Sequence, residues 1–143
     1  MKDYLHQMVA PIEDDNDARC VVREYLQART LEFLQDCGAF ANWAFVGGTA
    51  LRFLYSLPGF SEDLDFSITD ATDDARFTEN MKRIKNRFLR EDYKVTIKSK
   101  TEKTVKSAFI KFPGLLSELD LSPHAAEVIA IKIELDSNPP AGA

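Results

Sequence analysis

The sequence predicts one α+β domain, a mixed β-sheet with helices packed mainly on one face. Three observations lead to this fold class. The chain has 143 residues with 45% hydrophobic content, enough for one core. Three segments carry apolar residues at helical spacing, and several others alternate apolar and polar residues with the period of a β-strand.

The first predicted element is a long helix over residues 16–37. Acidic residues and Asn16 precede it, and Gly38 is placed as a C-terminal cap. Its apolar positions recur at helical spacing and are Val22, Leu26, Phe33, Leu34 and Cys37.

A short strand and a second helix follow. The stretch NWAFVGG at 42–48 is apolar and ends in a glycine turn, and TALRFLYS at 49–56 resumes helical spacing until Pro58 and Gly59 break it. The next stretch, EDLDFSI at 62–68, alternates as a strand does.

The second half of the chain predicts one more helix and three strands. Residues 74–91 form the strongest amphipathic segment, with Phe77, Met81, Ile84 and Phe88 on one side. Three alternating strands follow and complete the sheet: YKVTIKS at 93–99, TVKSAFIKF at 104–112 and VIAIKIELD at 128–136.

Composition narrows the classes of function. A net charge of -5 argues against a domain coated with basic residues for gripping nucleic acid, although a local basic face remains compatible with it. Two cysteines on one predicted helix do not make a disulfide framework. The sequence has no apolar stretch of the roughly 20 residues that a membrane span needs, and its first residues lack the apolar region of a secretory signal. We expect no membrane association and a cytoplasmic location.

Two carboxylates share one face of the strand at 62–68. Asp63 and Asp65 are two residues apart, so their side chains point the same way while Leu64 and Phe66 point into the core. Such a pair repels itself unless a cation lies between, and Mg²⁺ bound by carboxylates and substrate phosphates is a common solution. The alternative is an ordinary solvent-facing strand, because acidic residues are frequent on polar faces.

A glycine turn lies just upstream of these acids. Gly47 and Gly48 stand where a strand gives way to a helix, whose free N–H groups form a natural site for phosphate. Thr49 offers a hydroxyl for capping or for a phosphate, and Arg52 could reach a phosphate or pair with an acid. A tight turn that binds no ligand explains the glycines equally well.

A third carboxylate is available on the last predicted strand. Lys132, Glu134 and Asp136 face outward together, because the intervening residues are apolar. Glu134 lies in mid-strand and is the first choice for a third metal ligand, with Asp136 at the strand end as the second. A solvated acidic face is the competing interpretation.

Taken together, these residues resemble the nucleotidyltransferase AbiEii/AbiGii toxin family, within the DNA polymerase β-like nucleotidyltransferase superfamily. The likeness is carried by the double glycine that opens a helix, the S-E-D-L-D-F strand at 61–66, and the I-K-I-E-L-D strand that leads into N-P-P at 131–140. It implies a polymerase-β-like fold. It also implies that Asp63, Asp65 and Glu134 are catalytic and hold Mg²⁺ or Mn²⁺, with Asp136 as a further candidate ligand.

The resemblance also implies substrates and partners. Gly47, Gly48, Thr49, Arg52 and Ser61 would bind the nucleotide. The enzyme would transfer a nucleotide from an NTP to an acceptor such as tRNA, in a toxin–antitoxin or abortive-infection system of phage defence, opposed by a cognate antitoxin protein. Family members continue into a helical second half, so we expect residues 1–143 to be the nucleotidyltransferase domain of a longer protein. A catalytically inactive module of the same fold, binding a nucleotide or a partner, is the alternative.

One locally basic region remains to be explained. It includes the predicted strands from residue 93 onward, and one interpretation is that these strands, together with the predicted helix at 74–91, form a track for an RNA backbone. Because no aromatic residues are expected among these lysines on that face, a solvated sheet surface is the favoured one. The lysines are Lys94, Lys98, Lys100, Lys103, Lys106 and Lys111.

Overall fold

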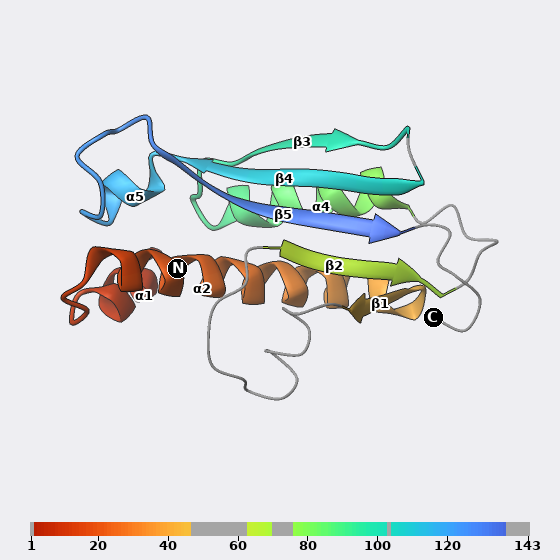
Figure 1. The fold of residues 1–143 in the computed structure, drawn as a ribbon, viewed down its shortest axis with the longest axis horizontal. Helices are drawn as coiled ribbons and strands as arrows, with labels where there is room; N and C mark the ends of the chain where they lie inside the picture. Colours follow the sequence, from red (N-terminus) through yellow and green to blue (C-terminus); the bar gives the residue numbers. More distant parts are fainter. Residues whose placement is uncertain (1, 47–62, 70–75, 103, 137–143) are drawn as a thin grey trace.

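The computed structural model describes residues 2–46, 63–69, 76–102 and 104–136, which form a five-stranded mixed sheet with the helices on one side (Figure 1). The helices α2 and α4 lie behind the strands in this view, and the opposite face of the sheet is open among the described residues. The elements are α1 (Lys2–Val9), α2 (Asp15–Asp36), the 3₁₀ turn η1 (Ala39–Ala41), β1 (Trp43–Val46), β2 (Asp63–Ile68), α4 (Phe77–Arg90), β3 (Thr96–Lys100), β4 (Val105–Pro113), α5 (Leu115–Glu118) and β5 (Val128–Asp136).

The strands are ordered β1-β2-β5-β4-β3 across the sheet. The central pair, β2 and β5, is parallel, and the other three pairs are antiparallel. The sheet is therefore mixed, and the last strand of the chain lies between the second and the fourth. This confirms the predicted fold class.

The long helix α2 begins and ends within one residue of the prediction. The carboxylate of Asp14 accepts hydrogen bonds from the backbone N–H groups of Asn16 and Asp17 at 2.8 and 3.1 Å, which satisfies two otherwise unpaired donors. Gly38 follows the helix with a φ of 79°, the left-handed conformation that glycine adopts at low cost.

Two short helices were not predicted. In α1, Leu5 and Val9 are spaced by four residues and are both buried, so one side of this helix joins the core. The four-residue helix α5 buries Leu115 and Leu116 in the connection between β4 and β5. The predicted helix at 74–91 is observed as Phe77–Arg90, and the three predicted strands after it as β3, β4 and β5. The predicted helix at 49–56 lies outside the described residues.

An aromatic cluster packs α4 against α2 and against the sheet. The ring of Phe88 makes edge contacts with Phe33, Tyr93 and Phe112, with centroid distances of 4.9, 5.4 and 4.9 Å. Phe88 is fully buried. At the edge of this cluster, Arg29 of α2 forms an ion pair with Glu91, the residue after α4.

The described helices include none that is both long and apolar enough to cross a membrane. The two cysteines, Cys20 and Cys37, are free thiols with partly buried side chains.

Replacing Phe88 by alanine should destabilise the domain strongly. The change removes a fully buried ring from the contact of two helices and the sheet, which typically costs about 3–5 kcal/mol. Leu89→Ala, at the next position but 46% exposed, should change the free energy of unfolding by less than about 0.5 kcal/mol. Urea unfolding followed by circular dichroism measures both, and equal effects would contradict this packing.

Candidate active site

The parallel pairing of β2 with β5 brings the predicted acidic residues together. In this register Asp65 lies opposite Glu134, and Asp63 lies opposite Lys132. Leu64 and Phe66 are buried beneath the sheet at 0% and 2% exposure, so the two aspartates between and beside them project from the open face. Glu134 projects from the same face because Ile133 and Leu135 are fully buried.

The two candidates for the third carboxylate occupy different positions. Glu134 is directly beside Asp65, whereas Asp136 lies opposite Ser67, one step further along the same face and at the last residue of β5. The register thus makes Glu134 the nearer neighbour of the aspartate pair, and its role as a ligand stays a prediction.

The neighbouring carboxylates and partial burial both affect the pKa of Asp65. Partial burial raises the pKa of this carboxyl above its ordinary value, and the negative charges of Glu134 and Asp63 raise it further. A hydrogen bond with Glu134 acts in the same direction, and the ammonium of Lys132 acts in the opposite one. The folded protein therefore holds Asp65 in an environment that disfavours its ionised form.

Among the described residues, Lys132 contributes a positive charge to this acidic cluster. Its Nζ lies 2.7 Å from Oε1 of Glu134, and the hydrogen bond and charge of Glu134 raise the pKa of the lysine. On its other side the same Nζ lies 5.7 Å from the ring centroid of Phe109, within cation–π range. Sequence reasoning placed Lys132 on the outward face and gave it no function. The signal was its position two residues before Glu134, which puts both on one face.

The donor atoms suit a hard divalent cation, since Mg²⁺ and Mn²⁺ prefer carboxylate oxygens. The raised pKa of Asp65 fits this use, because a divalent cation would relieve the repulsion that burial and two neighbouring acids create. Among the described residues, no three histidine, cysteine, aspartate or glutamate side chains are already grouped to hold an ion. Glu134 would have to exchange Lys132 for the metal.

The predicted nucleotide-binding residues lie outside the described part of the chain. These are Gly47, Gly48, Thr49, Arg52 and Ser61. The strand that leads to the glycines is described, however, and its last residue, Val46, lies opposite Asp65 in the β1–β2 pairing. The chain therefore enters the glycine segment from a point beside the acids.

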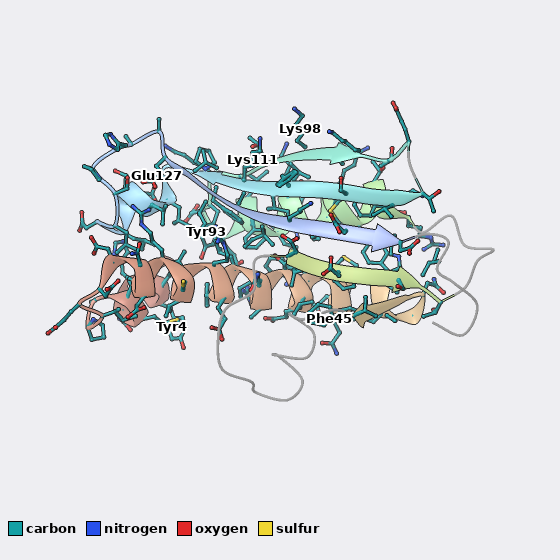
Figure 2. All side chains as sticks on the ribbon, viewed as in Figure 1. Tyr4, Phe45, Tyr93, Lys98, Lys111 and Glu127 are labelled. Carbon is teal, nitrogen blue, oxygen red and sulfur yellow. The ribbon has the colours of Figure 1, made fainter. Side chains whose placement is uncertain are left out.

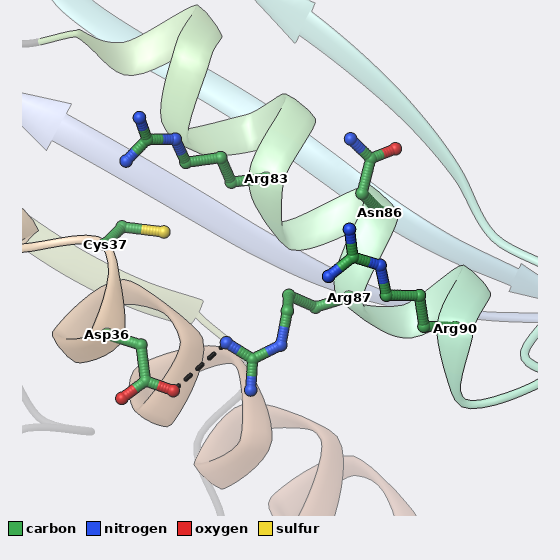
Figure 3. A pocket seen from close by; sticks show the side chains of 6 residues that line it. All are labelled: Asp36, Cys37, Arg83, Asn86, Arg87 and Arg90. Atoms are coloured by element: carbon green, nitrogen blue, oxygen red, sulfur yellow. Dashed lines mark hydrogen bonds and ion pairs between the residues drawn. The ribbon is translucent and has the colours of Figure 1, made fainter.

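A second charged region lies on the helical side of the molecule. A cavity of about 250 Å³ opens between the end of α2 and the outer side of α4, lined by Asp36, Cys37, Arg83, Asn86, Arg87 and Arg90 (Figure 3). Arg87 is ion-paired with Asp36 at 3.1 Å, and its guanidinium also lies 4.5 Å from the ring centroid of Phe33. Arg83 is paired with Glu79. The helices separate this cavity from the open face that carries the acids.

The arrangement of the sheet is that of a nucleotidyltransferase fold. The chain is similar to a crystal structure of a protein named as a candidate nucleotidyltransferase from H. pylori, with a TM-score of 0.56 and 20% sequence identity. The likeness covers 85% of this chain and 48% of that one, so this chain spans about half the length of its structural relative.

The family follows from the sequence match. Residues 29–142 match the model of the nucleotidyl transferase AbiEii toxin of type IV toxin–antitoxin systems, and the chain belongs to this family. The match includes both acidic strands and the glycine segment between β1 and β2, which confirms the resemblance. No curated protein matches the chain.

Asp65→Asn should stabilise the metal-free protein at neutral pH. The substitution removes one of three crowded negative charges, and because solvent screens an incompletely buried group the expected rise in Tm is only about 1–3 °C. A raised pKa in the folded state means that wild type regains this stability as the pH falls, so the difference in Tm should shrink through the titration of Asp65. Thermal unfolding in EDTA at several pH values measures it.

Lys132→Met, in contrast, should destabilise the metal-free protein. The change leaves Glu134, Asp65 and Asp63 without their shared cation, so Tm should fall in low salt and recover toward wild type in high salt. A variant as stable as wild type in low salt would mean that the Lys132–Glu134 contact does not balance the acids.

Proposed function

We propose that this chain is a metal-dependent nucleotidyltransferase domain whose reacting centre is the acidic cluster on the open face of β2 and β5. The observation that carries the proposal is the register that sets Asp65 opposite Glu134 with Asp63 beside them. Family membership supports nucleotidyl transfer as the chemistry. The raised pKa of Asp65 supports the binding of a cation beside this carboxylate.

In this proposal Asp63, Asp65 and Glu134 hold Mg²⁺ or Mn²⁺, with Asp136 as the reserve ligand near the strand end. The metal would lower the pKa of the attacking hydroxyl and neutralise charge that develops on the transferred phosphate. The protein's own contribution is placement. Two strands with buried alternate residues fix the carboxylates on one face, and the ion pair with Lys132 holds the side chain of Glu134 in place.

The remaining substrate contacts follow from the family resemblance. Gly47, Gly48, Thr49, Arg52 and Ser61 are proposed to bind the phosphates of the NTP, and tRNA is proposed as the acceptor. A cognate antitoxin is the proposed protein partner, and a cytoplasmic location is consistent with these roles. Residues 1–143 are proposed to be the nucleotidyltransferase domain of a longer protein.

A second candidate is a binding module of the same fold that transfers nothing. The observation in its favour is the ion pair at 2.7 Å between Lys132 and Glu134, which already neutralises one of the three acids. Such a module would bind a nucleotide or a partner protein without needing a divalent cation at this place.

Isothermal titration with Mg²⁺ and each NTP in turn should separate the two candidates. Wild type should bind one or more nucleotides in a metal-dependent way, and an Asp63→Asn, Asp65→Asn double variant should lose this binding. Glu134→Gln should weaken it at least about tenfold, because even partners outside the ligand shell are typically worth ten- to hundredfold in metal affinity.

A matched control is Glu79→Gln on α4, which removes one carboxylate paired with Arg83 on the helical side and should leave binding unchanged. Nucleotide binding that is equally strong in EDTA and in the double variant would favour the binding module. Metal-dependent binding that survives Glu134→Gln would instead point to Asp136 as the third ligand.

A further inference from the structure

A groove lined by three lysines and a phenylalanine lies on the same open face as the acids. It has a volume of about 230 Å³, and its lining comes from the antiparallel strands β3 and β4: Lys98, Lys100, Ser107, Phe109 and Lys111. Figure 2 shows Lys98 and Lys111 on these two strands, at the β3 side of the sheet. The groove is distinct from the arginine-lined cavity behind α4.

Strand register connects the groove to the acids in two rows across the sheet. In one row, Asp65 and Glu134 are followed by Ser107 and Lys100. In the other, Asp63 and Lys132 are followed by Phe109 and Lys98. Neighbouring strands are about 4.8 Å apart, so each row passes from carboxylates to lysines within about 15 Å.

The lysines of the groove are available to a ligand. Among the described residues, none of Lys98, Lys100 and Lys111 has an ion-pair partner, and the net charge of the whole chain is -5. The positive charge here is thus a local feature of one surface rather than a property of the whole chain. A negatively charged ligand is the complement of such a surface.

An aromatic ring lies among these lysines, contrary to the expectation from the sequence. Phe109 is 38% exposed on the open face, opposite Lys98 on one side and Lys132 on the other. Lysines that track a backbone, combined with an exposed ring on which a base can stack, are the features that bind single-stranded nucleic acid. A duplex keeps its bases stacked and offers no free base to the ring.

We propose that this groove binds the single-stranded end of the acceptor polynucleotide, with a base on Phe109 and phosphates on Lys98, Lys100 and Lys111. The acceptor role rests on the proposed function, whereas single-strand binding stands on the groove itself. The position of the groove relative to the acids fits this role. In the strand order, β1, which leads to the glycine segment, lies on one side of the acids, and the groove on β3 and β4 lies on the other. Nucleotide and acceptor would thus approach the carboxylates from opposite sides.

Fluorescence anisotropy with a labelled, unstructured 12-nucleotide RNA tests this. Wild type should bind in low salt, and the logarithm of its affinity should fall with the logarithm of salt with a slope of about -2, as three phosphate contacts predict. Lys98→Ala combined with Lys111→Ala should weaken binding about tenfold and reduce the slope to about -0.7. Phe109→Ala should weaken binding at least about fivefold, and Phe109→Trp should restore it.

The matched control is Lys82→Ala combined with Lys85→Ala, which removes the same charge from exposed positions of α4 on the other side of the sheet. Equal losses in this control and in the groove variant would overturn the proposal, as would a duplex of the same length that binds as tightly as the single strand. Circular dichroism and Tm of each variant show that loss of binding is not loss of fold.

The RNA-binding test and the nucleotide-binding test can fail independently of each other. Binding of RNA that survives Asp63→Asn, Asp65→Asn while metal-dependent nucleotide binding is lost is the expected pattern. If wild type binds Mg²⁺ and an NTP but no single-stranded RNA, the groove proposal is wrong and the enzyme proposal stands. If RNA binds in the groove but no nucleotide binds at all, the groove remains a single-strand site and the acceptor role is wrong.

Discussion

The parallel pairing of β2 with β5 is the constraint on which the candidate site depends. It sets two segments from distant parts of the sequence side by side, so that Asp65 meets Glu134. Since side chains alternate along a strand, a slip by one residue would send the acids of one strand into the helix-covered core. Burial of Leu64, Ile133 and Leu135 therefore fixes the site as firmly as it fixes the fold.

Alternation predicted which residues share a face, and caps predicted where α2 begins and ends, because both are local properties of the sequence. The neighbours of each strand are not local. Nothing in VIAIKIELD indicates that β5 lies between β2 and β4, and so the contact of Lys132 with Phe109 could not be foreseen. The helices α1 and α5 were missed because eight and four residues carry too little periodicity, and tertiary packing of residues such as Leu5 and Leu115 stabilises them instead.

The open face is divided by charge along the direction that crosses the strands. Carboxylates occupy β2 and the end of β5, and unpaired lysines occupy β3 and β4 among the described residues. Because the chain as a whole has a net charge of -5, the lysines of β3 and β4 are a local attraction for a polyanion on this face. Such a division favours one orientation of an anionic ligand over others, which is how charge contributes to specificity more than to affinity.

Lys132 lies between the acidic and the basic part of the open face and contacts residues of both. Its ammonium contacts Glu134 at 2.7 Å and faces the ring of Phe109 at 5.7 Å, so the charge balance of the acids and the character of the groove are coupled through one side chain. A cation that takes over Glu134 must compete with this ion pair, which lowers its apparent affinity. The lysine thus released would add its charge to the groove beside Phe109. A half-buried lysine suits this double position, because a fully buried ion pair would cost far more to break.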